Sequence, residues 1–301
     1  MSPFKQQQVH RQTNDLPVLA ICYDFDKTLS PDDMQAQGFI QSVKYDVQKF
    51  WEESNELAKN NDMDTNLAYM YKMLEASYNN FYLNKKALME YGSKVELFNG
   101  VETWFKRICD YGKAHGVLVE HYIISSGLKE MIEGTVMAKE NAFKKIYASS
   151  FLYDDKGVAC WPAQAINYTN KTQFLFRIQK GVLDINDTGV NNFIQPENIR
   201  VPFRNMVYIG DSDTDIPCMS LVNANGGYSI GVYDPTTKNK AKVYHMMNQH
   251  RIRYYTEADY RDGSNLDTLV KEIITKTAAA EVLERRFILD KNDAATKQQQ
   301  Q

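Results

Sequence analysis

The stretch VLAICYDFDKT, residues 18–28, predicts both the fold class and the position of a site. Its first six residues form a nearly continuous apolar run, which is typical of a strand buried on both faces of a parallel sheet. Side chains alternate along a strand, so we expect Asp24 and Asp26 on one side and Phe25 on the other. Two carboxylates would then meet at the carboxyl end of a strand, where open α/β sheets form their binding sites.

Other apolar runs along the chain resemble the first one. They occupy residues 117–124, 206–209 and 228–232. Helical patterns lie between them, such as residues 100–111 and 128–143. This alternation predicts an α/β domain with a doubly wound, Rossmann-like and mainly parallel sheet. Between residues 145 and 169 we expect a small β excursion, with a hairpin turn at residues 154–157.

The segment 31–97 does not follow this alternation and is predicted to be helical throughout. Apolar side chains recur there at steps of three or four residues, which is typical of amphipathic helices. The first stripe is Phe39, Val43, Val47, Phe50 and Trp51, and the second is Leu67, Met70, Tyr71, Leu74, Tyr78 and Phe81. Asn84 is a suitable N-cap for a third helix. We therefore expect an all-helical module inserted directly after the first strand.

These patterns divide the chain into a core, an insert and two tails. The α/β core is predicted to comprise residues 17–30 and 98–289, with the helical insert at 31–97 between them. Residues 1–16 and 290–301 are polar and low in complexity, so we expect disordered tails there.

A second acidic group, Asp211-Ser-Asp-Thr-Asp215, follows the apolar run at 206–209. If both acidic groups lie at strand ends, Asp24, Asp26, Asp211 and Asp215 converge on one crevice. Carboxylates that share a crevice repel one another unless a cation is present. Mg²⁺ prefers oxygen ligands and keeps waters and a substrate phosphate in its shell. The sequence therefore predicts a Mg²⁺ site at this edge of the sheet.

Two further polar segments stand at predicted element boundaries. Ser125-Ser126-Gly127 follows the second apolar run, where a hydroxyl and backbone amides are placed to bind phosphate oxygens. We favour Ser125 because it directly follows the run, and Ser126 is the alternative. Lys171 opens a helix predicted for residues 172–179. A fixed ammonium at that point would neutralise charge on a transferring phosphoryl group.

The composition argues against several classes of partner. The chain has 35 basic and 38 acidic residues and a net charge of −3, which gives no electrostatic case for nucleic acid or an anionic membrane. No apolar run approaches the roughly 20 residues that span a bilayer, and the first 16 residues lack the apolar stretch of a secretory signal. The four cysteines show no CxxC spacing, which favours four buried thiols in a cytoplasmic protein. No motif indicates an oligomeric state.

Four segments together resemble the haloacid dehalogenase-like (HAD) hydrolase superfamily, in its phosphoserine-phosphatase-like branch. They are DFDKT (24–28), YIISSG (122–127), NKT (170–172) and YIGDSDTD (208–215), in the order in which the family has them. The resemblance implies a Mg²⁺-dependent phosphatase that hydrolyses a small-molecule phosphomonoester. It also implies that the insert is a type 1 cap, which closes over the site and selects the substrate.

The resemblance implies a role for each motif residue. Asp24 would attack phosphorus and form an aspartyl-phosphate. Asp26 would protonate the leaving group and then activate water, while its backbone carbonyl binds the metal. Asp215 would complete or brace the metal site, and Thr28 would orient the loop. The expected metal ligands are Asp24, Asp26, Asp211 and Asp215, and the expected substrate-binding residues are Ser125, Lys171 and Thr28.

Two alternatives use the same fold. A phosphotransferase or mutase would pass the phosphoryl group to a second hydroxyl instead of water. A catalytically silent binding or regulatory protein would keep the fold without turnover, and it is disfavoured because every catalytic position is filled. Dehalogenases resembling this family lack the second aspartate, so Asp26 argues for phosphate chemistry.

Overall fold

The computed structural model describes residues 16–77 and 83–298, and its centre is a seven-stranded sheet. The strands are β1 (Val18–Tyr23), β2 (Leu118–Leu128), β3 (Lys145–Tyr153), β4 (Ala159–Gln164), β5 (Met206–Gly210), β6 (Tyr228–Tyr233) and β7 (Tyr254–Glu257). Residues 1–15 of the predicted tail at 1–16, residues 299–301 of the predicted tail at 290–301, and Tyr78 and Phe81 of the second stripe lie outside the described residues.

The strand order is β4-β3-β2-β1-β5-β6-β7, and every pair is parallel except β3 with β4. The predicted mainly parallel α/β sheet is therefore confirmed. The antiparallel β3–β4 hairpin is the β excursion that the sequence predicted, with its turn at residues 154–157. Strand β7 had no sequence prediction, because it contributes only four residues at the sheet edge.

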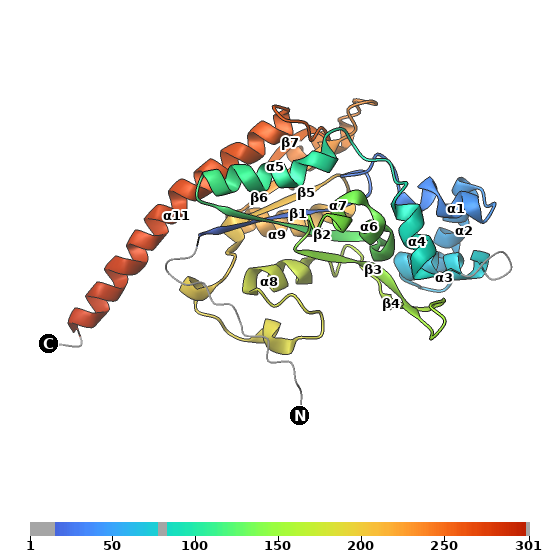
Figure 1. Cartoon of the computed structure of the whole chain (residues 1–301), viewed down its shortest axis with the longest axis horizontal. Coiled ribbons are helices and arrows are strands. Elements are labelled where there is room, and N and C mark those ends of the chain that lie inside the picture. Colours follow the sequence, from blue (N-terminus) through green and yellow to red (C-terminus); the bar gives the residue numbers. More distant parts are fainter. Residues whose placement is uncertain (1–15, 78–82, 299–301) are drawn as a thin grey trace.

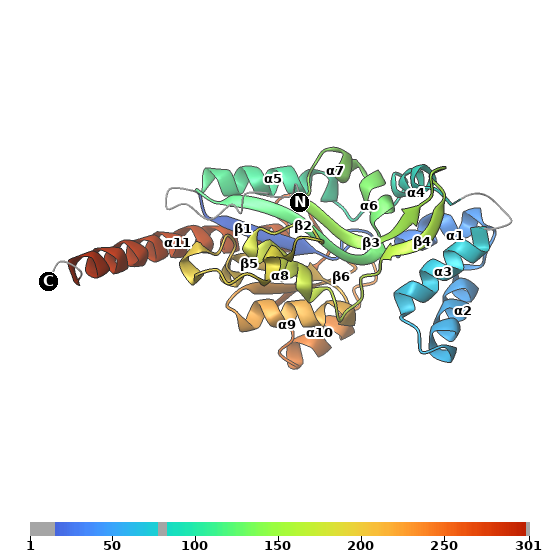
Figure 2. The same ribbon diagram turned by 90° about the horizontal axis from the view of Figure 1, so that it is seen from below.

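Helices cover both faces of the sheet (Figure 2). On one face lie α5 (Val101–Ala114), α6 (Lys129–Gly134) and α7 (Val136–Lys139), and on the other lie α8 (Thr172–Lys180), α9 (Ile216–Ala224) and α10 (Ala241–Asn248). Alternate residues of β1 enter two separate cores: Leu19 and Ile21 pack on the first face, whereas Ala20 and Cys22 pack on the second. Burial on both faces explains why this strand is apolar throughout.

The insert follows β1 and lies at one end of the sheet (Figure 1). It contains a short 3-10 helix, η1 (Met34–Gln37), and the helices α1 (Phe39–Ser42), α2 (Val47–Asn60), α3 (Thr65–Ser77) and α4 (Lys85–Gly92). The first stripe is divided between two helices, because Asp46 is extended and caps α2 by accepting a hydrogen bond from the Lys49 amide (2.9 Å). Asn84 caps α4 as predicted, with its side chain accepting from the Ala87 amide (2.9 Å).

One helical pattern of the core also differs from the prediction. The pattern at residues 128–143 is interrupted at Thr135, which is extended and caps α7. The connection before β5 contains the 3-10 helices η2 (Thr188–Asn191), η3 (Pro196–Asn198) and η4 (Phe203–Asn205), and η5 (Asp213–Asp215) follows β5.

Cys22 and Cys218 are buried, but Cys109 is half-buried and Cys160 is exposed, so the expectation of four buried thiols is wrong for two of them.

The last helix, α11 (Asn265–Gln298), packs beside α5 and then projects beyond the core (Figure 1). Residues 290–298 therefore continue a helix where the sequence analysis expected a disordered tail. Salt bridges four residues apart, Arg286 with Asp290 (3.2 Å) and Asp293 with Lys297 (2.7 Å), support this exposed end of the helix. Within the described ranges, no helix combines the length and the apolar character that crossing a bilayer requires.

Candidate active site

Sheet register brings the motif residues to one place. Strand β1 lies between β2 and β5, and Tyr23 is opposite both Ile123 and Ile209. The next residue, Asp24, donates its backbone N–H to the Ile209 carbonyl (3.0 Å). The order of strands changes direction around β1, and this is the topological switch point at which open α/β sheets form their sites.

Three aspartates form the centre of the site. One carboxylate oxygen from each of Asp24, Asp211 and Asp215 lies within 4.8 Å of the others. Asp24 and Asp215 are buried and Asp211 is mostly buried, so their mutual repulsion is poorly screened. A donor set made only of carboxylate oxygens in a recess fits Mg²⁺, which also takes ligands from water and phosphate. These three residues would hold the ion.

Lys171 supplies the positive charge inside this cluster. Its side chain is fully buried, and its ammonium lies 2.8 Å from Asp215 Oδ1 and 3.2 Å from Asp24 Oδ2. Burial alone would lower the pKa of Lys171, but the carboxylates of Asp215 and Asp24 raise it above its ordinary value. The lysine is therefore a fixed cation between the two acids, directly before the first turn of α8.

Asp215 is held by contacts on both of its oxygens. Oδ1 accepts from Lys171 and from the Tyr208 hydroxyl (2.9 Å), and Oδ2 accepts from the Ser212 amide (3.2 Å). Gly210 allows this packing, because a Cβ at that position would lie 2.5 Å from Asp215 Oδ2. Asp215 thus orders the loop after β5, in addition to belonging to the acidic cluster.

The second aspartate of the first motif is oriented by the insert. Asp26 Oδ1 accepts a hydrogen bond from the Met34 amide (2.8 Å), at the start of η1. Burial, followed by the negative charges of Asp33 and Asp24, raises the pKa of Asp26 well above its ordinary value. A carboxyl group in this environment is suited to carrying a proton near neutral pH.

The pKa values of Asp24, the candidate nucleophile, and of Asp211 are also shifted. Burial and the charge of Asp215 raise the pKa of Asp24 to about 6, although Lys171 opposes this shift. Burial, Asp215 and Asp24 raise the pKa of Asp211 to about 7, against the opposing charge of Lys242. Both shifts arise because carboxylates are crowded in a poorly solvated recess.

The two candidate serines both border the same cavity. Ser125 is fully buried, and its Oγ accepts a hydrogen bond from the Gly127 amide (3.0 Å). Within the described part of the chain, Ser126 Oγ has no hydrogen-bond partner, while the Ser126 carbonyl accepts from the Tyr69 hydroxyl (2.9 Å). The apolar run was predicted to end at residue 124, before the two serines, and this boundary is wrong. Strand β2 continues to Leu128, with an irregularity in its pairing with β3, so both serines lie within the strand.

The cavity has a volume of about 250 Å³ and is bordered by residues of the sheet core and of the insert. Core residues that line it are Asp24, Asp26, Lys27, Ser125, Ser126, Asn167, Tyr168, Asp211, Ser212, Thr214 and Lys242, and insert residues are Asp33, Thr65 and Asn66. A larger and more open depression of about 590 Å³ lies beside α11 and contains none of the motif aspartates. The smaller cavity, which contains motif residues, is therefore the candidate active site.

The sequence model of the haloacid dehalogenase-like hydrolase family matches residues 21–220, which include all four motifs and the insert. The chain belongs to the haloacid dehalogenase-like hydrolase family. An uncharacterised relative from Borreliella burgdorferi is 27% identical to this chain, and the match covers 85% of this chain and 96% of the relative.

Solved structures share the fold of this hydrolase at low sequence identity. A HAD family hydrolase from Salmonella enterica serovar Typhi superimposes with a TM-score of 0.56 at 17% identity, over 86% of this chain and 72% of that one. A phosphoserine phosphatase in its apo form superimposes with a TM-score of 0.52 at 14% identity, over 84% and 98%. A cytosolic 5′-nucleotidase IIIB bound to cytidine gives 0.51 at 16% identity, over 88% and 87%.

Of the predicted substrate-binding residues, Ser125 lines the cavity, whereas Lys171 and Thr28 are fully buried and are not part of the lining. Among the described residues, the Thr28 Oγ1 has no hydrogen-bond partner, and the Thr28 carbonyl accepts from the Tyr260 hydroxyl (2.7 Å). Thr28 therefore belongs to the packing of the loop after Asp24 and does not border the cavity.

Sequence reasoning missed the residues that this hydrolase brings from the insert and from α10. Asn66 donates its side-chain amide to the Ile166 carbonyl, and Asp64 accepts from the Asn167 side chain. Lys242 Nζ lies 3.7 Å from Asp211 Oδ2. Asn167 stands four residues before Lys171 and was within reach of a motif search. Neither Asn66 nor Lys242 has a local sequence signal, because only the tertiary fold brings them to the cavity.

Proposed function

We propose that this hydrolase is a Mg²⁺-dependent phosphatase that cleaves a small phosphomonoester through an aspartyl-phosphate on Asp24. The observation that carries the proposal is the pair formed by Asp24 and Lys171, 3.2 Å apart, within an all-carboxylate cluster. An anionic nucleophile beside a fixed cation is suited to attack on a negatively charged phosphoryl group. Solved structures with a similar fold include a phosphoserine phosphatase and a 5′-nucleotidase.

In the first step, a carboxylate oxygen of Asp24 forms a bond to phosphorus as the bond to the substrate oxygen breaks. Asp26 gives its proton to that leaving oxygen, which its raised pKa permits near neutral pH. Lys171 and the Ser125 hydroxyl bind the phosphoryl oxygens. Mg²⁺ bound by the carboxylates would neutralise charge that develops on the phosphoryl group.

In the second step, Asp26 is ionised and accepts a proton from a water molecule as that water attacks the phosphorus of the aspartyl-phosphate. The bond between phosphorus and the Asp24 oxygen breaks, inorganic phosphate leaves, and both aspartates return to their starting states. The Met34 amide keeps Asp26 oriented in both steps, because it bonds the carboxyl oxygen Oδ1 in either protonation state.

The cavity favours a small and polar substrate. Its volume of about 250 Å³ is below the roughly 300–1,000 Å³ of pockets that enclose drug-sized ligands. Beyond the aspartates, the walls include amide and hydroxyl side chains from Thr65, Asn66, Asn167 and Tyr168, together with the ammonium groups of Lys27 and Lys242. The amide and hydroxyl groups can hydrogen-bond to hydroxyl or amine groups of a metabolite, and the ammonium groups suit an anionic one.

The test is phosphate release from a panel of phosphorylated sugars, amino acids, amines and nucleotides, with and without Mg²⁺. We expect Mg²⁺-dependent release that Asp24→Asn reduces by about a thousandfold or more, since a single catalytic nucleophile is lost. Asp213→Asn is the matched control, because Asp213 is an exposed acid in the second motif. Acid-quenched protein should also carry phosphate on the peptide that contains Asp24.

Three results would contradict the proposal. Equal turnover by Asp24→Asn and by the wild-type protein would show that Asp24 is not the nucleophile. Phosphoryl transfer that requires an added alcohol, with no release to water, would favour the phosphotransferase alternative. Substrate binding without any turnover by folded, Mg²⁺-loaded protein would favour the silent binding protein.

A further inference from the structure

The insert is joined to the core by two chain crossings, which lie side by side. One crossing follows the first motif at Thr28 and Leu29, and the other returns to the core at Phe98 and Asn99. The Phe98 amide donates to the Leu29 carbonyl (2.9 Å), so the two crossings are bonded to each other. Any movement of the insert relative to the core must pass through these residues.

One buried residue from a distant part of the sequence bonds to both crossings, to one through its side chain and to the other through its backbone. Tyr260, in the loop between β7 and α11, donates its hydroxyl to the Thr28 carbonyl (2.7 Å). Its backbone N–H donates to the Asn99 carbonyl (2.8 Å). Tyr260 is fully buried, so these bonds are made without competition from solvent.

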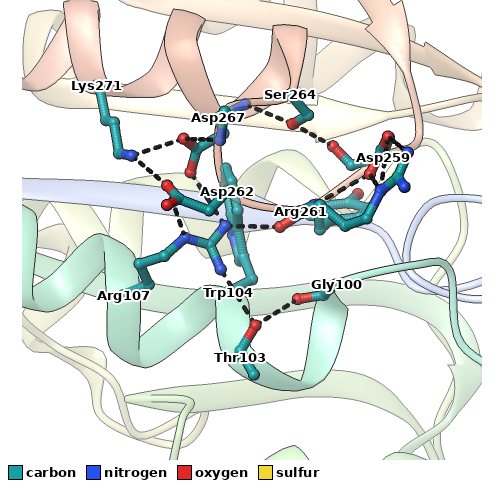
Figure 3. A network of polar contacts seen from close by, with 12 residues as sticks. Gly100, Thr103, Trp104, Arg107, Asp259, Arg261, Asp262, Ser264, Asp267 and Lys271 are labelled. Atoms are coloured by element: carbon teal, nitrogen blue, oxygen red, sulfur yellow. Dashed lines mark hydrogen bonds and ion pairs between the residues drawn. The ribbon is translucent and has the colours of Figure 1, made fainter.

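Tyr260 is in turn held by Arg107, which belongs to a network of charges between α5 and α11 (Figure 3). Arg107 donates to the Tyr260 carbonyl (2.7 Å) and to Asp267 Oδ1 (3.0 Å). Lys271 bonds both Asp267 and Asp262 (2.7 Å each). The aromatic ring of Trp104 meets the Tyr260 ring edge to face, with 5.2 Å between centroids.

The loop that carries Tyr260 lies very close to the returning crossing. Gly100 has φ +85°, and a Cβ at that position would lie 2.4 Å from the Arg261 amide nitrogen. Only glycine permits both this left-handed conformation and this approach. The contact between the Tyr260 loop and the crossing is therefore built into the backbone.

The same network contacts the chain on both sides of the proposed nucleophile. Trp104 donates its indole N–H to the Tyr23 hydroxyl (2.8 Å), and Tyr23 immediately precedes Asp24. On the far side, the amides of Thr28 and Leu29 both bond the Phe25 carbonyl (3.2 and 2.8 Å), which closes a compact turn after Asp24. A displacement of Thr28 is thereby transmitted to the turn that contains Asp26.

We propose that Tyr260 is a positioning residue for the proposed phosphatase reaction, and this inference rests on that proposed function. Its hydroxyl fixes the carbonyl of Thr28, and its backbone fixes the returning crossing at Asn99. It thereby sets the position of the turn that carries Asp24 and Asp26 relative to the point at which the insert joins the core. Tyr260 itself does not line the cavity.

The direct test is Tyr260→Phe, which removes only the hydroxyl. We expect kcat per folded molecule to fall about tenfold while KM stays within about twofold, because small displacements of reacting groups affect the chemical step. Amide hydrogen exchange of a peptide covering residues 25–30 should become faster. The exchange measurement needs no substrate, so it reports on positioning even if the phosphatase activity is absent.

Tyr147→Phe is the matched control. Tyr147 is also buried and donates its hydroxyl to a backbone carbonyl, that of Leu183 (2.9 Å). Both variants leave one carbonyl without its donor, so both should lose similar stability. Only Tyr260→Phe should change kcat and the exchange of residues 25–30.

Unchanged kcat and unchanged exchange in Tyr260→Phe would overturn the inference, as would equal effects of the two variants. If Tyr260→Phe does not fold, Arg107→Lys takes its place, since it weakens the support of the Tyr260 carbonyl and keeps the charge. We expect a smaller fall in kcat of about threefold, with faster exchange at residues 25–30. Wild-type behaviour of a folded Arg107→Lys protein would also overturn it. If the wild-type protein has no phosphatase activity but residues 25–30 still exchange faster in Tyr260→Phe, the result contradicts only the proposed function.

Discussion

The ammonium of Lys171 lies 2.8 Å from Asp215 Oδ1, and neither side chain is exposed to solvent. A buried ion pair of this kind contributes little net stability, but the loss of one partner leaves the other charge buried and unpaired. Lys171 faces two carboxylates, because Asp24 is also within 3.2 Å. The site therefore depends on this lysine for folding as well as for the proposed chemistry.

We expect Lys171→Met to reduce the free energy of unfolding by about 3 kcal/mol at pH 8. Without the ammonium, the folded-state pKa of Asp24, which is already raised to about 6, rises further above its unfolded value. The folded variant then binds more protons than the unfolded chain, so its stability decreases as pH rises. Urea unfolding should therefore show a smaller deficit at pH 5.5 than at pH 8. Lys242→Met is the control, because Lys242 is half-exposed and should be nearly neutral. A deficit that does not vary with pH would contradict this account.

Mg²⁺ affinity should depend on pH through the carboxylates whose pKa values are raised. Asp211, at about 7, and Asp24, at about 6, hold protons that the cation must displace. We expect the Mg²⁺ dissociation constant to increase by about tenfold between pH 8 and pH 6. Isothermal titration calorimetry without substrate measures both the affinity and the protons released. Asp211→Asn should bind Mg²⁺ more weakly and with less pH dependence. Affinity independent of pH in the wild-type protein would count against a carboxylate site.

The two serines of the second motif can be distinguished by mutation. Ser125 Oγ accepts from the Gly127 amide, which leaves its own proton free to donate to a phosphoryl oxygen in the cavity. We expect Ser125→Ala to lower kcat/KM by about 10- to 100-fold, whereas Ser126→Ala should change it by less than about threefold. Steady-state kinetics with the preferred substrate decides the assignment. A larger effect in Ser126→Ala would reverse it.

The insert should affect substrate binding through the start of α3. Asp64 accepts from the amides of Asn66 (2.8 Å) and Leu67 (3.1 Å), and it also bonds the Asn167 side chain across the cavity. We expect Asp64→Ala to raise KM about fivefold or more, with a smaller change in kcat, because it releases the insert from the core. Asp46→Ala is the matched control, since Asp46 caps α2 but contacts no core residue in its capping bond. Each variant should lose about 1 kcal/mol of helix stability. Equal KM values for the two would contradict a role for this contact.

Much of the fold was predictable from local patterns. The apolar runs that became β1, β2, β5 and β6 stand out because a strand buried on both faces has few polar residues. The cap of α4 at Asn84 was also predictable, since capping depends on residues three apart in sequence. The end of α11 was not, because the composition of residues 290–298 resembles a tail although helical ion pairs are available there.

The candidate site was predictable to a similar extent and for a related reason. Asp24 and Asp211 each follow an apolar strand directly, and parallel strands end at the same edge of the sheet. Their convergence therefore follows from strand positions alone. Asn66 and Lys242 were missed because they reach the cavity from helices whose orientation no local pattern specifies. Their roles depend on long-range packing between the insert, α10 and the core.

By itself the sequence determined that acidic residues directly follow two apolar strands, since strand identity and motif spacing are local properties. Only the tertiary structure decided that Lys171 is buried between Asp24 and Asp215, because burial depends on the packing of α8 against the sheet. Tertiary structure alone also joined Tyr260 to Thr28 across 232 positions of the chain. Contacts between residues so far apart arise from the fold as a whole, and no property of either segment predicts them.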